Sequence, residues 1–264
     1  MKITVDLNKE AILEVIKSTI FGKTLYIFDA VDSTNKVAWH LALEGKPEGT
    51  VVIADYQYRG RGRESRIWFS PPGVNLYMSV ILRPKINAEL ISPLPLLSGV
   101  AVAECMSNFF PEKVSLKWPN DVLLSGKKVA GILMETKVRG NQVDFVILGI
   151  GININLDVTT LPEELRERAT SMRAEKGEVF SRVGVISDLL YHLEGNYLLF
   201  LNLGFSVIKA RWLYFSPLYQ PITVRSGEET ISGIVTELDD RGALFITDDE
   251  GKIHRILAGN TLLT

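Results

Sequence analysis

The stretch GRGRESRIW, residues 60–68, decides how this chain is interpreted. Two glycines, Gly60 and Gly62, alternate there with arginines, and the stretch ends in an aromatic residue, Trp68. Glycine lets backbone amides approach a ligand closely, and arginine offers forked donors that match carboxylate and phosphate oxygens. We therefore predict an anion-binding loop, although a solvated basic loop is the alternative until the neighbouring segments are considered. The arginines of the stretch are Arg61, Arg63 and Arg66.

Predicted strands and helices flank this loop on both sides. Apolar residues alternate in the strands and recur at helical spacing in the helices. Asn8 is predicted to cap the first helix and Gly22 to end it. The predicted strands are residues 24–30, 50–57, 75–84, 114–118, 129–136 and 143–154, and the predicted helices are residues 9–20, 35–44, 91–110 and most of 161–212.

The last part of the chain differs in character. From Tyr219 onward, short strands are separated by Ser-Gly, Asp-Asp-Arg-Gly and Asp-Glu-Gly turns, which predicts a small β-barrel of the SH3-like kind. We expect two domains, residues 1–217 and residues 218–264. The fold class is α+β, with a mixed, largely antiparallel sheet flanked by helices in the first domain.

Composition excludes several classes of protein. A net charge of -2 argues against a protein that mainly neutralises nucleic-acid phosphates. One cysteine and three histidines exclude a disulfide framework and a zinc site. The start of the chain does not resemble a signal peptide, and the longest uncharged stretch, residues 90–103, is too short to span a bilayer. We therefore expect a cytoplasmic protein that binds neither DNA nor membranes.

Polar residues gather where predicted elements meet. Ser33, Thr34 and Asn35 stand between a strand and a helix, and Gln57 ends the strand that leads into the loop. A helix N-terminus binds small polar groups readily, so these side chains are candidate ligand contacts. Capping of the helix by Ser33 or Thr34 is the equal alternative, because a capping hydroxyl needs no further function.

Later strands show the same pattern. Lys117 and Lys128 flank apolar strands, where a lysine is usually a solvated edge residue. Asn153 and Asn155 end the segment GIGININ, whose glycines leave room for a group to lie against the sheet. Polar residues at the ends of several strands indicate a binding site.

Four motifs in a fixed order carry a resemblance to a known family. The chain resembles the biotin–protein ligases, whose fold is related to that of class II aminoacyl-tRNA synthetases, from about residue 24 to its end. Ser65 departs from the family, which usually has glycine there, so the loop is expected to be stiffer. The DNA-binding domain of some relatives is missing, so a repressor role is not expected. The motifs are GRGRESRIW (60–68), KWPNDVLL (117–124), KKVAGIL (127–133) and GIGININ (149–155).

The resemblance implies a reaction in two steps. Biotin and ATP give biotinoyl-5′-AMP and pyrophosphate, and a lysine of a biotin carboxyl carrier protein then accepts the biotin. The carboxylate of biotin is ionised at neutral pH, so the first step needs mainly positioning and charge stabilisation. Mg²⁺ would neutralise the leaving pyrophosphate. No metal site made by protein side chains is predicted. The glycines of the loop would let it close as a lid over the reactive anhydride.

The motifs also imply roles for particular residues. Asp121 would orient or deprotonate the acceptor amine, although a turn-forming aspartate explains it at least as well. The implied catalytic residues are Lys128, Arg63, Arg61 and Asp121. The implied biotin-binding residues are Ser33, Thr34, Asn35, Gln57, Gly60, Arg61, Gly62, Arg63, Trp68, Lys128 and Gly131, and the implied ATP-binding residues are Arg63, Arg66, Asn120, Lys128, Asn153 and Asn155.

Two rival functions stay open at this point. A lipoate–protein ligase or octanoyltransferase would be expected to share the sheet, but the loop and the KWPND corner fit the biotin family. A non-enzymatic biotin-sensing regulator would use the C-terminal barrel as an interaction module, and Lys128 among phosphate-binding motifs weighs against it. The residues decide neither the carrier, nor whether the protein is a monomer or a homodimer, nor the task of the barrel.

Overall fold

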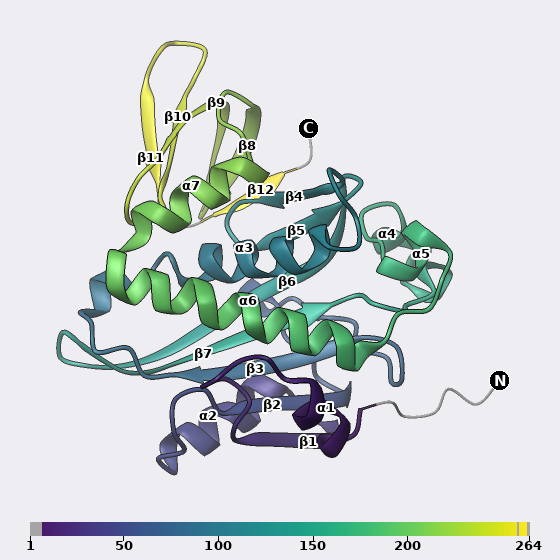
Figure 1. Cartoon of the computed structure of the whole chain (residues 1–264). Coiled ribbons are helices and arrows are strands. Elements are labelled where there is room, and N and C mark those ends of the chain that lie inside the picture. Colours follow the sequence, from purple (N-terminus) through teal and green to yellow (C-terminus); the bar gives the residue numbers. More distant parts are fainter. Residues whose placement is uncertain (1–6, 258, 263–264) are drawn as a thin grey trace.

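The computed structural model describes residues 7–257 and 259–262 and contains two sheets. Figure 1 shows the smaller sheet at one end of the molecule, above a larger sheet that lies behind the long helix α6 (Arg182–Leu203). The large sheet has the order β1-β2-β3-β7-β6-β5-β4. Its strands are β1 (Leu25–Val31), β2 (Val51–Gln57), β3 (Leu76–Leu82), β4 (Val114–Lys117), β5 (Asp121–Leu124), β6 (Lys127–Arg139) and β7 (Gln142–Ile152).

The large sheet is mixed, as predicted. β1 pairs with β2 in parallel, and the other pairs are antiparallel. The peptide bond between Trp118 and Pro119 is cis, at the corner that joins β4 to β5. Ser125 and Gly126 have positive φ and form the tight hairpin between β5 and β6. The α+β fold class is thereby confirmed.

Helices cover both faces of the large sheet. Helix α3 (Leu94–Ser107) packs on one face and α6 packs against α3, whereas α2 (Thr34–Leu43) packs on the other face. On β7, Leu148 and Ile150 belong to the large core and Phe145 and Ile147 to a separate small core that includes residues of α2. This alternation follows from the two-residue period of a strand. All seven residues of β3 are buried because both faces of that strand are covered.

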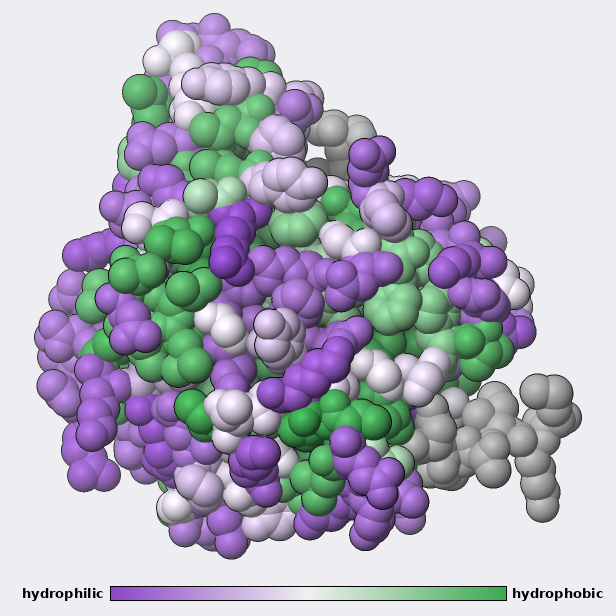
Figure 2. Space-filling view, viewed as in Figure 1, coloured by the Kyte–Doolittle hydropathy of each residue, from purple (hydrophilic) through white to green (hydrophobic). Residues whose placement is uncertain are grey.

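The remaining helices lie at the edges of the domain. Ser181 is the N-cap of helix α6. Figure 2 shows hydrophilic and hydrophobic side chains intermixed on the outer face that α6 and α7 help to form. The other helical elements are α1 (Lys9–Val15), α4 (Glu163–Arg166), α5 (Met172–Lys176), α7 (Phe205–Phe215) and the short 3-10 turns η1 (Arg63–Ser65), η2 (Ala88–Leu90) and η3 (Val158–Thr160).

The first helix is shorter than its sequence pattern predicted. Asn8 caps it as expected, by accepting from the backbone N–H of Glu10, but the helix ends at Val15 and Gly22 does not terminate it. The carboxylate of Glu194 on α6 instead accepts the backbone N–H groups of residues 19–21. Past Val15 the backbone is not helical, and Phe21 is buried whereas Ile20 is exposed.

The prediction of a closed barrel at the C-terminus is wrong. The described strands form an open five-stranded antiparallel sheet of order β11-β10-β9-β8-β12. Among the described residues, the edge strand β12 pairs with β8 and not with β11, and its residue Thr261 donates to the backbone oxygen of Trp118, next to β4. The strands are β8 (Pro221–Ser226), β9 (Glu229–Leu238), β10 (Leu244–Thr247), β11 (Ile253–Ile256) and β12 (Asn260–Leu262).

One apolar stretch, Ala88–Ser107, is long and hydrophobic enough to cross a membrane by composition alone. It contains η2 and α3, and 72% of its apolar window is buried inside the protein. A helix that is apolar on all sides is expected where protein surrounds it. We therefore interpret α3 as a core helix of the large domain.

Candidate active site

A floor of glycines lies on the α2 face of the large sheet. Beyond Phe145 and Ile147, the same face of β7 continues with Gly149 and Gly151, and Gly131 of β6 pairs with Gly151. Helix α2 therefore covers only part of this face, and the missing side chains leave a cavity of about 690 Å³ over the rest. The cavity is the candidate active site.

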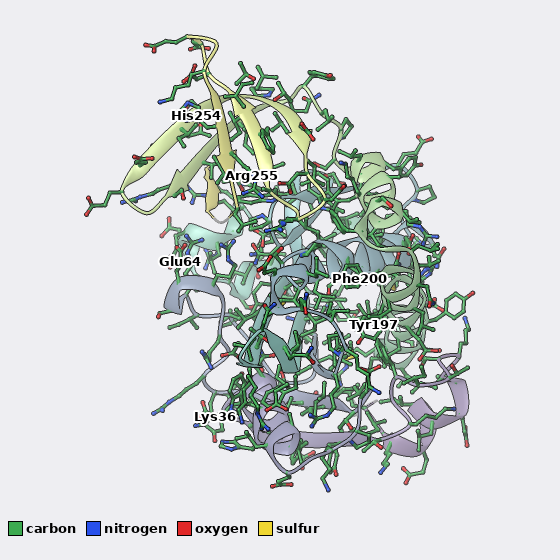
Figure 3. All side chains as sticks on the ribbon, turned by 90° about the vertical axis from the view of Figure 1, so that its left-hand side faces the viewer. Lys36, Glu64, Tyr197, Phe200, His254 and Arg255 are labelled. Carbon is green, nitrogen blue, oxygen red and sulfur yellow. The ribbon has the colours of Figure 1, made fainter. Side chains whose placement is uncertain are left out.

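The arginine loop folds over this floor as a small hairpin. Gly62 donates its backbone N–H to the oxygen of Arg66 at 2.7 Å, and Trp68 donates to Gly60 at 3.0 Å. The Trp68 indole lies so close to the floor that a Cβ on Gly151 would come within 2.6 Å of it. Figure 3 shows Glu64, at the tip of the loop, on the outer edge of the molecule below the C-terminal sheet. The loop and its aromatic residue therefore cover the cavity in the structure.

The α2 end of the cavity is a buried polar network. Gln57 accepts from the backbone N–H of Thr34 at 2.9 Å and donates to Ser70 at 3.0 Å. Ser33 occupies the N-cap position, but its side chain makes no capping hydrogen bond. Capping therefore does not account for Ser33. Asn35 is almost fully buried, and its amide donates to Glu135 at 2.8 Å, a residue that the sequence did not single out.

Lys128 is fixed at both its backbone and its side chain. Its N–H donates to the oxygen of Arg168 at 2.8 Å, and its oxygen accepts from Thr170 at 2.9 Å. Its ammonium group lies 2.6 Å from Asp121 and 5.4 Å from the centre of the Trp68 ring. The motif containing Lys128 and the segment after α4 therefore meet at the cavity, although about forty residues separate them in the chain.

The far end of the cavity is rich in partly buried cations. Arg63 donates to the side-chain oxygen of Asn120 and to the backbone oxygen of Gly259, both at 3.1 Å. Burial lowers the pKa of Arg63. Burial also lowers the pKa of Lys117. The charge of the nearby Asp121 opposes this shift, and the charge of Lys128 adds to it. Crowded cations of this kind favour an anionic ligand, because the ligand would restore their lost solvation.

The structure brings most of the predicted residues to one place. Gly60 and Asn155 do not line the cavity, and Asn155 is bound at both ends of its amide to the backbone of Phe180. Asn153 reaches the cavity, but its amide donates to Thr170 and accepts from Asn75. The predicted residues that line the cavity are Ser33, Thr34, Asn35, Gln57, Arg61, Gly62, Arg63, Arg66, Trp68, Asn120, Asp121, Lys128, Gly131 and Asn153.

Sequence reasoning missed part of the lining. Lys117 was noticed at a strand end, but no role was given to it. Arg168 and Glu167 follow a short helix and carry no motif of their own. Their place becomes clear only from the backbone pairing with Lys128. The additional lining residues include Tyr77, Met78, Lys117, Leu161, Leu165, Glu167, Arg168 and Thr261.

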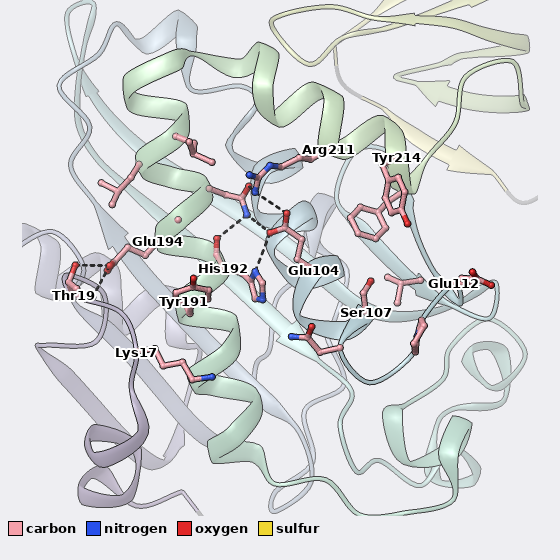
Figure 4. A pocket seen from close by; sticks show the side chains of 18 residues that line it. Lys17, Thr19, Glu104, Ser107, Glu112, Tyr191, His192, Glu194, Arg211 and Tyr214 are labelled. Atoms are coloured by element: carbon pink, nitrogen blue, oxygen red, sulfur yellow. Dashed lines mark hydrogen bonds and ion pairs between the residues drawn. The ribbon is translucent and has the colours of Figure 1, made fainter.

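A second cavity, of about 1110 Å³, lies among α3, α6 and α7 and contains none of the predicted residues. Figure 4 shows Glu104, His192 and Arg211 pointing toward one another there. Glu104 lies 3.3 Å from His192 and 3.0 Å from Arg211. Burial alone would raise the pKa of Glu104, but hydrogen bonds from His192 and Asn196 hold it below its ordinary value. These charges hold three helices together, so we interpret them as structural. The first cavity therefore stays the candidate active site.

Comparison with known proteins agrees with the fold. Residues 27–153 match the Biotin/lipoate A/B protein ligase family, which defines the class. Residues 220–260 match the biotin protein ligase C terminal domain.

Individual relatives narrow the class. The bifunctional ligase/repressor BirA of Bacillus subtilis is 39% identical over 89% of this chain and 73% of that protein. The biotin–[acetyl-CoA-carboxylase] ligase of Paracoccus denitrificans is 33% identical over 84% of this chain and 93% of that protein. A biotin protein ligase from Aquifex aeolicus in complex with biotin and ATP aligns with a TM-score of 0.78 and 34% identity, over 91% of this chain and 98% of that one. The chain belongs to the biotin protein ligase family.

Proposed function

We propose that this protein is an ATP-dependent biotin–protein ligase. It joins biotin to ATP, releases pyrophosphate, and transfers biotin from biotinoyl-5′-AMP to a lysine of a biotin carboxyl carrier protein. The observation that carries the proposal is the meeting of Lys128, Arg61 and Arg63 over a floor of glycines. This arrangement offers cations above a flat surface, which suits a planar ring system that ends in a carboxylate.

The first step requires two anions to approach each other. The biotin carboxylate is its own nucleophile, and it must come close to the α-phosphate of ATP. Lys128 and Arg63 would reduce the repulsion between these groups, because cations in a partly buried site act more strongly than in water. Asp121 holds the Lys128 ammonium group at 2.6 Å and thereby orients it.

The polar end of the cavity would hold the biotin rings. Thr34 and Gln57 are already bonded to each other, so their positions are set before a ligand arrives. Ser33 adds a hydroxyl at the N-terminus of α2. Trp68, which already rests on the glycine floor, would pack beside the rings. Preorganised groups of this kind lower the entropic cost of binding.

The cationic end would hold the triphosphate. Lys117, Arg168 and Asn120 line it together with Arg63. Within the described residues, no group of three or more His, Cys, Asp or Glu side chains is arranged to hold a metal ion. Mg²⁺ usually binds through substrate phosphates and one or two carboxylates, and Glu167 on the lining would be such a carboxylate. Mg²⁺ would neutralise the charge of the leaving pyrophosphate.

The second step needs a neutral acceptor amine near the activated carboxyl group. The predicted role of Asp121 as its base competes with the ion pair to Lys128, so we assign Asp121 mainly to the orientation of that lysine. The carrier protein, a homodimer and a cytoplasmic location stay predictions.

Pyrophosphate release tests the proposal directly. The purified protein is mixed with ATP, Mg²⁺ and biotin, without a carrier, and pyrophosphate and bound biotinoyl-AMP are measured. About one equivalent of pyrophosphate per chain is expected with biotin, since a product that stays bound allows one turnover. Release with lipoate and not with biotin would show that the protein is a lipoate–protein ligase instead. Release with neither acid would contradict the proposal.

A further inference from the structure

Glu135 lies beside the active site without lining it. On β6, Gly131, Leu133 and Glu135 face the same side, because side chains of a strand alternate. The Glu135 carboxylate is divided between two partners. One oxygen accepts from the amide of Asn35 at 2.8 Å, and the other lies 3.0 Å from the guanidinium group of Arg61.

These two contacts, a hydrogen bond and an ion pair, complete a chain of polar contacts between the ends of the arginine loop. The chain starts at the backbone oxygen of Trp68 and finishes at Arg61, so the floor is tied to both ends of the loop. Its members in order are Ser70, Gln57, Thr34, Ser79, Asn35 and Glu135, and the backbone N–H of Thr34 makes the bond to Gln57. Every member of this series of contacts except Glu135 is a neutral side chain. Glu135 is therefore the one charged member between Trp68 and Arg61.

We propose that Glu135 is a positioning residue that holds the loop through Arg61 while the site is empty, and that it releases Arg61 to the carboxylate of an incoming ligand. The proposal rests on the proposed function, since the ligand in question is biotin. Glu135 contacts one terminal nitrogen of the Arg61 guanidinium group, and a carboxylate that binds the fork bidentately would use that same nitrogen. Glu135 and the biotin carboxylate therefore compete for it.

The strength of the contact suits a reversible latch. The side chain of Arg61 is 53% exposed and that of Glu135 is 24% exposed. An ion pair exposed to this degree is screened by water, and its removal changes an equilibrium by about two- to fivefold. A contact of that size holds the loop in the empty protein and still yields to a substrate anion.

The variant that tests the latch is Glu135→Gln. The glutamine oxygen still accepts from Asn35, so the floor is preserved and only the charge that holds Arg61 is removed. Hydrogen exchange of the backbone amides in residues 60–68, measured without any ligand, is expected to accelerate by about two- to fivefold. The matched control is Asp144→Asn, which removes a carboxylate of similar exposure, 27%, from its ion pairs with Lys137 and Arg139. Equal exchange in wild type and Glu135→Gln would overturn the latch.

Ligand binding separates a charge effect from a structural one. Glu135→Gln is expected to bind biotin about two- to fivefold more tightly, because Arg61 is already released. It is expected to bind neutral biotinamide with unchanged affinity, because that ligand has no carboxylate to compete for Arg61. In an Arg61→Gln background, Glu135→Gln should have no further effect. A change that is equal for both ligands, or that persists without Arg61, would overturn the proposal.

The two proposals fail in different ways. A protein that binds neither biotin nor biotinamide would contradict the proposed function. Hydrogen exchange of residues 60–68 without ligand would still test whether Glu135 holds the loop. A protein that forms biotinoyl-AMP but shows no difference in the Glu135→Gln variant would keep the function and exclude the latch.

Discussion

Trp68 rests on Gly151 so closely that a methyl group at position 151 would lie 2.6 Å from the indole ring. The contact joins the arginine loop to the centre of the large sheet. It also explains why Gly151 and its pair Gly131 have to be glycines, since a side chain at either position would meet Trp68.

Gly151→Ala is therefore expected to push Trp68 off the floor. Overpacking of this kind costs about 1–3 kcal/mol, so biotin affinity should fall about tenfold or more. Isothermal titration with biotin measures it, and a shift of tryptophan fluorescence reports the displaced ring. Gly195→Ala is the matched control, because nothing lies within 4 Å of that position. Wild-type affinity in Gly151→Ala would show that Trp68 does not hold the ligand.

Arg63→Gly removes the link between the loop, Asn120 and the C-terminal sheet. Hydrogen bonds made by a charged group contribute about 1.5–3 kcal/mol, so escape of biotinoyl-AMP should rise at least tenfold. Retention of the labelled intermediate on a filter measures this escape, and biotin appearing on lysines of an unrelated protein confirms it. Arg139→Ala, at a side chain that is 84% exposed, should leave retention unchanged. Equal retention in Arg63→Gly and wild type would exclude this role.

Lys117 should make ATP binding sensitive to alkaline pH. Burial, with Lys128 and Arg168 nearby, holds its pKa below the ordinary value, and ATP requires the protonated form. The KM for ATP should therefore rise as the pH climbs through this lowered pKa, below the value of about 10.4 for a free lysine. In Lys117→Arg the group stays charged and the rise should be smaller. Lys127→Arg, an exposed position on the neighbouring hairpin, serves as the control. Superimposable pH profiles would contradict the assignment.

Ser65 occupies the left-handed region of backbone conformation, with φ of 61°. A residue with a side chain there costs about 1–2 kcal/mol, more when it is β-branched, whereas glycine is tolerated. Ser65→Val should therefore destabilise the folded loop and weaken biotin binding about fivefold or more, and Ser65→Gly should preserve binding. Titration of the two variants side by side decides the matter. Equal affinities would mean that the loop changes conformation when the ligand binds.

The elements that local pattern controls could be predicted from the sequence. The strands and the Ser125 hairpin follow from alternation and turn residues, whereas the clustering of Lys128 with the arginine loop was implied by the family resemblance. Asn155 could not be excluded in advance, because its partner Phe180 is brought back by the fold. Arg168 reaches the cavity for the same reason, through backbone pairing with Lys128.

Two other differences have equally specific causes. The first helix ends early because Glu194, far along the chain, takes the backbone N–H groups that a longer helix would use. In the described part of the C-terminal sheet, the edge strand β12 lies against the large sheet, where Thr261 bonds to Trp118, and does not pair with β11. In each case a distant contact overrides a local pattern, and local patterns contain no information about such contacts.

The partial cover that α2 gives to its face of the sheet has a thermodynamic consequence. Next to α2, the layer over the glycines is formed by Trp68 and the arginine loop and not by a second helix. A bound ligand completes that layer and becomes, for the time of the reaction, part of the hydrophobic core. Heat resistance of the folded chain should therefore depend on ligand supply, since binding to the folded state alone stabilises it by mass action.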